Sequence, residues 1–187
     1  TPAAVWLLTS GMRPVSDCTW PTHLTDSRAI VPVTSSPPMP ATDTSSAFVV
    51  LNTNTPIVTL GPAPDLKPQP ALAKSWTVSG ANVTLHLRND VKWTNGRTVN
   101  ANDVVYSWLR TISPQLGADY AYQFYGIKGA QEYNSCKPSA SNQQCNSLKS
   151  KVGITAPDAT TVKITLTSPQ PWFMQQLSHT SFIPVNK

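Results

Sequence analysis

The sequence has little charge and no long apolar run, and both shortages exclude classes of protein. Charged residues make up 12% of its 187 residues, and no two of its 14 Lys and Arg residues are adjacent. Nucleic-acid-binding domains gather basic residues on one face, so this pattern argues against a nucleic-acid partner. No apolar stretch approaches the roughly 20 residues that a membrane-spanning helix needs. Low charge among many Ser, Thr, Asn and Gln residues is typical of a secreted protein.

Glycine is scarce beside proline, with eight residues against 18, and the motifs that depend on glycine are missing. The chain has neither a glycine-rich phosphate loop nor a Gly-x-Ser-x-Gly nucleophile elbow. Its three histidines, His23, His86 and His179, are far apart in the sequence, so surface positions suit them better than a metal site or a catalytic base. The sequence therefore predicts no catalytic residue, no metal ligand and no cofactor.

Cysteine is also rare, with three residues in the chain. Cys136 and Cys145 enclose eight residues that are nearly all polar or turn-forming, and no zinc-ligand pattern lies nearby. Such a loop cannot pack a core of its own, so a short disulfide would stabilise it by restricting the unfolded chain. We expect a Cys136–Cys145 disulfide rather than two free thiols, and with it an oxidising, extracytoplasmic setting.

The clearest strand signal lies in the middle of the chain. Val83, Leu85 and Leu87 alternate with polar residues, which predicts a strand with one buried face. Turn-forming residues at 79–82 separate this strand from Trp76 and its neighbours, so a hairpin is expected. Residues 162–166 show the same alternation and predict a second half-buried hairpin.

A capped helix follows these strands. Asn100 is a favoured N-cap residue, and Asp103, three residues later, can bond back to the cap as in a capping box. Apolar residues between 101 and 112 then recur on one helical face. Ser113 and the proline after it end the helix.

The remaining pattern indicates an α+β domain with a mostly antiparallel sheet and a few helices. One interpretation of its six tryptophans is a surface that stacks carbohydrate. Trp76, Trp93 and Trp108 instead lie among the apolar positions of the predicted strands and helix, so burial in the core is the prediction. Further short helices are expected at 43–52, 129–133 and 172–177, and a further strand at 57–60. The last of these helices is expected to pack against the core through Trp172, Phe173, Met174 and Leu177.

Several motifs of this region together resemble a known family. They are Pro70–Trp76, Leu85–Arg88, Val91–Gly96 and Ala101–Arg110, followed by Tyr120–Tyr122, Ile127–Ala130, Val152–Ile154 and Pro171–Phe173. Each is weak alone, but their order resembles that of the family 5 extracellular solute-binding proteins, the oligopeptide, dipeptide and nickel receptors of ABC importers. The resemblance covers roughly residues 43 to 187.

The resemblance implies the smaller lobe of a bilobal, periplasmic-binding-protein-like (class II) fold. We expect an irregular segment or a strand of the large lobe at residues 1–42. The smaller lobe would then occupy residues 43–178, and residues 179–187 would begin the return to the large lobe. Members of the family are more than twice as long as this chain, so we expect it to be a fragment that lacks most of the large lobe.

The resemblance also implies a function, which is to bind extracytoplasmic peptides for import. Such a protein is not an enzyme; it would act as a monomer, close its lobes over a peptide and dock to the membrane subunits of an ABC permease. A single lobe leaves much of a peptide in water, so we expect this chain alone to bind peptides weakly or not at all. A secreted sensor or adhesion module on the same fold is the alternative, and a secreted hydrolase is a more distant one.

Three residues are carried over as ligand contacts. Tyr120 matches the tyrosine that lies against the bound peptide in oligopeptide-binding members, and a one-residue length difference after it leaves Tyr122 or Tyr125 as substitutes. Thr42 and Asp43 lie where the family's chain crosses the cleft. Arg88 and Arg110 are candidates for binding an anionic ligand, but both stand at motif positions where a surface ion pair is expected instead.

Membrane anchoring is the last implication. Many members of the family carry a lipid on an N-terminal cysteine, which makes Cys18 a candidate anchor. Asp17 stands where the lipid-attachment motif has a small residue. An unmodified Cys18 is therefore the favoured interpretation, and a lipoprotein is the alternative.

Overall fold

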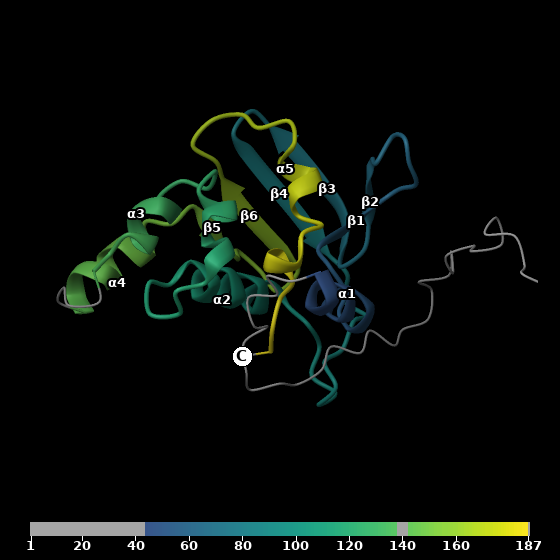
Figure 1. Ribbon diagram of the computed structural model, residues 1–187, viewed down its shortest axis with the longest axis horizontal. Helices are drawn as coiled ribbons and strands as arrows, with labels where there is room; N and C mark the ends of the chain where they lie inside the picture. Colours follow the sequence, from purple (N-terminus) through teal and green to yellow (C-terminus); the bar gives the residue numbers. More distant parts are fainter. Residues whose placement is uncertain (1–43, 138–141, 187) are drawn as a thin grey trace, which may run out of the picture.

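The computed structural model describes residues 44–137 and 142–186 (Figure 1). Its elements are α1 (Thr44–Thr53), β1 (Val58–Leu60), β2 (Pro68–Pro70), β3 (Ala73–Ser79), β4 (Asn82–Leu87), α2 (Ala101–Ile112), the 3₁₀ helix η2 (Asp119–Phe124), α3 (Ala130–Asn134), α4 (Asn142–Ser150), β5 (Ile154–Thr155), β6 (Thr161–Thr165), α5 (Phe173–Gln176) and the 3₁₀ helix η3 (Thr180–Phe182). The α+β arrangement is confirmed. Within the described residues, no helix is long and apolar enough to cross a membrane.

The main sheet has the strand order β3-β4-β6-β5, and every neighbouring pair is antiparallel. Strand β4 is central, and its Val83 and Leu85 lie opposite Ile164 and Val162 of β6. All four side chains are buried, which confirms both predicted alternations. Gly80 begins the two-residue turn between β3 and β4 with φ of 59°, a left-handed value that glycine adopts readily.

Smaller elements lie at both ends of the molecule, beside the main sheet. Strands β1 and β2 form a separate antiparallel pair at one end of the molecule, and α3 and α4 lie at the other (Figure 1). The strand expected at 57–60 and the helix expected at 43–52 are present as β1 and α1. β2 and η2 are elements that the sequence patterns did not indicate.

Helix α2 forms as its sequence predicts. The side chain of Asn100 accepts hydrogen bonds from the backbone N–H groups of Asn102 and Asp103, and the carboxylate of Asp103 accepts one from the N–H of Asn100. This reciprocal pair is a capping box. The apolar face from Ala101 to Ile112 is buried, and the helix ends before Ser113.

Asp103 also joins α2 to the preceding turn. Its side chain is only 3% exposed. It accepts hydrogen bonds from Trp93 Nε1, at 3.0 Å, and from two nitrogens of Arg97, at 3.0 and 2.8 Å. We call Asp103, Trp93, Arg97 and Asn100 the Asp103 network. A carboxylate that would be costly to bury alone is stabilised here by four donors.

The C-terminal segment, residues 182–186, lies along α2. Trp108 donates from Nε1 to the backbone oxygen of Phe182 at 2.8 Å, and the N–H of Val185 donates to Ser107 Oγ at 2.8 Å. Arg97 adds a hydrogen bond to the side chain of Asn186. These bonds hold the segment beside the core. Its continuation into a second lobe stays a prediction, as does the division of the chain at residues 42 and 178.

Burial of the tryptophans is confirmed for Trp93 and Trp108, but Trp76 is only half-buried. The reason is that Trp76 lies on β3, which is an edge of the sheet, so its ring packs against the core on one side only. Trp172 was also placed against the core, in the last short helix, and this was wrong. It is 61% exposed, because α5 turns Phe173 and Leu177 inward instead.

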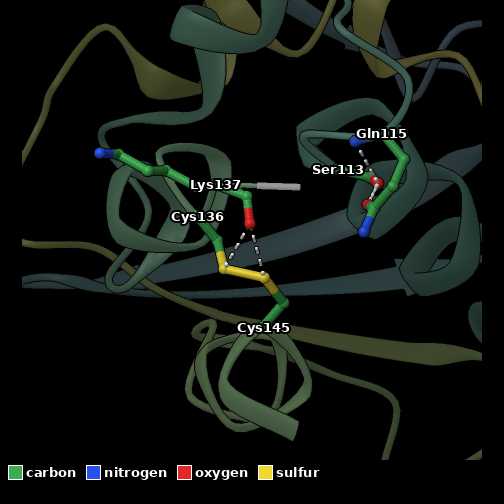
Figure 2. The surroundings of a disulfide bond; sticks show 5 residues. All are labelled: Ser113, Gln115, Cys136, Lys137 and Cys145. Carbon is green, nitrogen blue, oxygen red and sulfur yellow. Dashed lines mark hydrogen bonds between the residues drawn. A yellow bond between two sulfur atoms is a disulfide. The ribbon is translucent and has the colours of Figure 1, made fainter. Parts of the chain in front are cut away.

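The expected disulfide joins Cys136, which follows α3, to Cys145 of α4, with 5.8 Å between the Cα atoms. Figure 2 shows the backbone oxygen of Lys137 beside both sulfur atoms, at 4.0 and 3.8 Å. The interpretation of residues 137–144 as a loop was only partly right, since α4 begins at Asn142. Cys145 is therefore on the first turn of a helix, and the bond links α4 to α3.

Replacing Cys136 and Cys145 together by serine is expected to lower the free energy of unfolding by about 2–3 kcal/mol, because the bond closes a short loop in the unfolded chain. Denaturant unfolding without reductant measures the loss, and mass spectrometry of unreduced peptides checks the pairing. Cys18→Ser is the control and should leave the unfolding midpoint unchanged. Free thiols at both positions in material kept from reductant would contradict the assignment.

Candidate functional site

Two tyrosines lie together on η2. Ala121 and Phe124 of this 3₁₀ helix are buried and fix it to the core. Tyr120 and Tyr122 are left on its outer side, with 6.0 Å between their ring centroids. Tyr122 is 54% exposed and Tyr120 is half-buried. The helix therefore presents a pair of phenol rings at the surface.

His179 joins these tyrosines from a distant part of the chain. Its ring centroid lies 5.2 Å from that of Tyr120, and the two ring planes meet at 74°, an edge-to-face contact. His179 is half-buried and directly precedes η3. We call Tyr120, Tyr122 and His179 the Tyr120 cluster.

Contacts of neighbouring residues hold together the two segments that carry the Tyr120 cluster. Gln176 of α5 donates from Nε2 to both the backbone oxygen and the side-chain oxygen of Gln123, each at 2.8 Å. The rings of Phe124 and Phe182 lie 4.2 Å apart in the core. The 3₁₀ helix η2 is thus fixed to α5 by a polar contact and to η3 by an aromatic contact, and the cluster rests on a packed base.

The local hydrogen bonds of His179 assign its tautomer. Nδ1 accepts a hydrogen bond from the backbone N–H of Ser181 at 3.2 Å and lies 3.0 Å from Ser181 Oγ. A backbone amide can only donate, so Nδ1 must keep its lone pair. The neutral ring therefore carries its hydrogen on Nε2.

Burial favours this neutral form, because it lowers the pKa of His179 below its ordinary value of 6.5. The folded chain then binds fewer protons at this ring than the unfolded chain does. The contribution of His179 to stability is complete above pH 6.5 and is lost as the pH falls from there through the lowered pKa.

The other expected ligand contacts have different outcomes. Thr42 and Asp43 lie outside the described residues. Tyr125 donates from its hydroxyl to Asn134 Oδ1 at 2.6 Å, and Asn134 Nδ2 donates to the backbone oxygen of Ile112 at 2.7 Å. The hydroxyl of Tyr125 thus ties η2 to α3 and α2. Of the two substitutes for Tyr120, it is Tyr122 that lies beside it.

Arg88 was considered as a binder of anionic ligands, and the structure pairs it with a carboxylate. Its Nε and one terminal nitrogen lie 2.9 and 2.6 Å from the two oxygens of Asp90. The hydrogen bond from Arg88 lowers the pKa of Asp90 below its ordinary value. This confirms the expected surface ion pair. The guanidinium is taken up by its own chain rather than offered to a ligand.

Sequence reasoning missed His179, which it treated as an ordinary surface residue. The contact with Tyr120 joins two segments that are far apart in the sequence, one before β5 and one after β6. No local sequence pattern indicates such a contact. Together the three residues offer ring faces, two phenolic hydroxyls and one imidazole N–H. Such groups suit binding of a ligand that has both apolar and hydrogen-bonding parts.

Comparisons with known proteins agree on one family. The family described as "Bacterial extracellular solute-binding proteins, family 5 Middle" matches residues 67–187. Dipeptide-binding protein DppE of Bacillus subtilis is 38% identical over 125 residues, which are 66% of this chain and 21% of that protein. Periplasmic oligopeptide-binding protein OppA of Escherichia coli is 39% identical over 126 residues, 66% of this chain and 22% of that protein.

The fold agrees with the sequence match. The substrate-binding domain of an oligopeptide ABC transporter from Bacillus anthracis aligns with a TM-score of 0.67 and 33% identity, over 77% of this chain and 26% of that one. The described residues therefore form part of a lobe of the periplasmic peptide-binding fold, as expected. The chain spans about a fifth of the length of the relatives named above.

Proposed function

The chain belongs to family 5 of the bacterial extracellular solute-binding proteins, and we propose that it is part of a peptide-binding component of an ABC importer. The match across residues 67–187 carries the proposal, because it includes the sheet, α2 and the Tyr120 cluster. The relatives are named as dipeptide- and oligopeptide-binding proteins, which are binding proteins rather than enzymes. The permease subunits of such an importer would be its partners, and the binding unit would be a monomer.

Tyr120 is the proposed ligand contact within this chain. Its ring is half-buried on a packed base, so a peptide lying against it covers apolar surface at little cost in side-chain entropy. Tyr122 extends the same surface. Thr42 and Asp43 are proposed to approach the peptide as well, which stays a prediction from the family resemblance.

The proposed location is outside the cytoplasm. The Cys136–Cys145 bond is of a kind that persists in oxidising compartments, and the E. coli relative is named as periplasmic. Cys18 is the position at which a lipid anchor would attach. Asp17 before it favours the unmodified thiol.

The test is a titration of the 187-residue chain with a pool of short peptides, followed through the NMR signals of its tyrosine rings. Peptides are expected to shift the signals of Tyr120 and Tyr122 with an affinity of about millimolar, which corresponds to few contacts. Tyr120→Ala should weaken binding about tenfold, as loss of a central aromatic contact does.

Trp172→Ala is the matched control, since it removes an exposed aromatic ring outside the Tyr120 cluster, and it should bind like the wild type. Peptides that leave the Tyr120 signals unchanged would contradict the proposal. Equal affinity of the wild type and Tyr120→Ala would refute the assigned contact.

A further inference from the structure

The two ring nitrogens of His179 are in different situations. Nδ1 is taken up by the backbone N–H of Ser181. Nε2 has no hydrogen-bond partner among the described residues, and in that part of the chain no buried side-chain nitrogen or oxygen lacks a partner. The described residues therefore do not cover Nε2 completely. The ring thus presents an unused N–H donor from a position that contacts Tyr120.

We propose that His179 is a second ligand contact, which donates a hydrogen bond from Nε2 to a main-chain carbonyl oxygen of a peptide lying against Tyr120. This inference rests on the function proposed above. It assigns the contact a direction, because a neutral ring with Nδ1 occupied can donate at Nε2 but cannot accept there. The site would favour ligands that place an acceptor oxygen at Nε2, and it would form no hydrogen bond with an ammonium group there.

The fixed geometry strengthens the argument. The bond from Ser181 holds the imidazole ring in one orientation before a ligand arrives, so little rotamer entropy is lost when the ligand binds. Protonation would place a hydrogen on Nδ1, opposite the N–H of Ser181, and would break that bond. Burial keeps the ring neutral at neutral pH, since it lowers the pKa of His179.

Two substitutions separate binding from structure. In His179→Asn, the side-chain oxygen takes the place of Nδ1 and can still accept from Ser181, but no donor reaches the position of Nε2. In His179→Gln, an amide donor reaches that position, but the acceptor for Ser181 is lost. His179→Asn is expected to weaken peptide binding about five- to tenfold with an unchanged unfolding midpoint. His179→Gln should bind within about threefold of the wild type and unfold at lower denaturant.

The measurements use the 187-residue chain and a short peptide of small apolar residues, with free and amidated C-termini. A long-range ¹H–¹⁵N spectrum should show the hydrogen of the His179 ring on Nε2, and the signal of that nitrogen should move on titration. His179→Asn should weaken the binding of both forms of the peptide by the same factor. A dependence that disappears with the amidated form would overturn the assignment to a main-chain carbonyl.

Several other outcomes would refute the inference. One is a hydrogen on Nδ1 in the free chain. Another is His179→Asn binding like the wild type while peptides still shift the Tyr120 signals, which leaves the proposed function intact. A third is equal loss of binding in both variants together with equal loss of stability, which would make His179 a structural residue. Peptides that shift neither Tyr120 nor His179 would refute both proposals.

Discussion

Replacing Trp108 by alanine is expected to lower the free energy of unfolding by about 3–5 kcal/mol, the range for large buried aromatic side chains. The indole is fully buried and meets Phe124 and Phe182 edge-on, at centroid distances of 6.0 and 5.5 Å. Its Nε1 also donates to the backbone oxygen of Phe182. The substitution would leave a cavity at the centre of the core and remove the partner of that oxygen.

Denaturant unfolding measures this loss of stability, and two further variants serve as comparisons. Trp172→Ala deletes the same side chain from an exposed position and should change stability by less than about 0.5 kcal/mol. Trp108→Phe keeps an aromatic ring but removes the donor, so its loss should be smaller than that of Trp108→Ala. An unchanged midpoint for Trp108→Ala would mean that this face of α2 is not part of the core.

Asp103→Ala is expected to cost about 2–4 kcal/mol of stability, because several donors lose one acceptor at the same time. The buried Nε1–H of Trp93 would have no carboxylate to bond, and the N–H of Asn100 would lose its part of the capping box. Arg97 would lose a two-pronged partner. Because the Arg97 side chain is 38% exposed, water can replace part of that interaction.

The matched control is Asp90→Ala, which removes the carboxylate from an exposed arginine pair and should cost less than about 1 kcal/mol. Asp103→Asn should lie between the two, since its amide oxygen can still accept from Trp93. If Asp103→Ala were no more destabilising than Asp90→Ala, the Asp103 network would contribute nothing beyond an exposed ion pair.

These two sets of contacts also bear on the proposed binding surface. Trp108 holds the backbone at Phe182, and Arg97 of the Asp103 network bonds to Asn186. Both contacts fix the segment that follows His179. The Tyr120 cluster therefore depends on core contacts that touch none of its members, because they set the path of the chain on which His179 lies.

The sequence alone determined what depends on neighbouring residues. The alternation at Val83, Leu85 and Leu87 predicts a half-buried strand, because successive side chains of a strand point to opposite faces. The Asn100 and Asp103 pair predicts the start of α2, because a capping box is closed within four residues. The order of these motifs was also enough to indicate the family.

The tertiary structure alone decided what depends on residues that are distant in the sequence. Trp76 is half-buried because β3 is an edge of the sheet, which its own residues do not reveal. The sequence shows Asp103 only as the partner of the Asn100 cap, and the fold adds Trp93 and Arg97 to its partners. The contact between His179 and Tyr120 exists because η2 and η3 pack on the same core. The sequence shows which side chains are able to form such contacts. Which of them come together depends on the path of the folded chain.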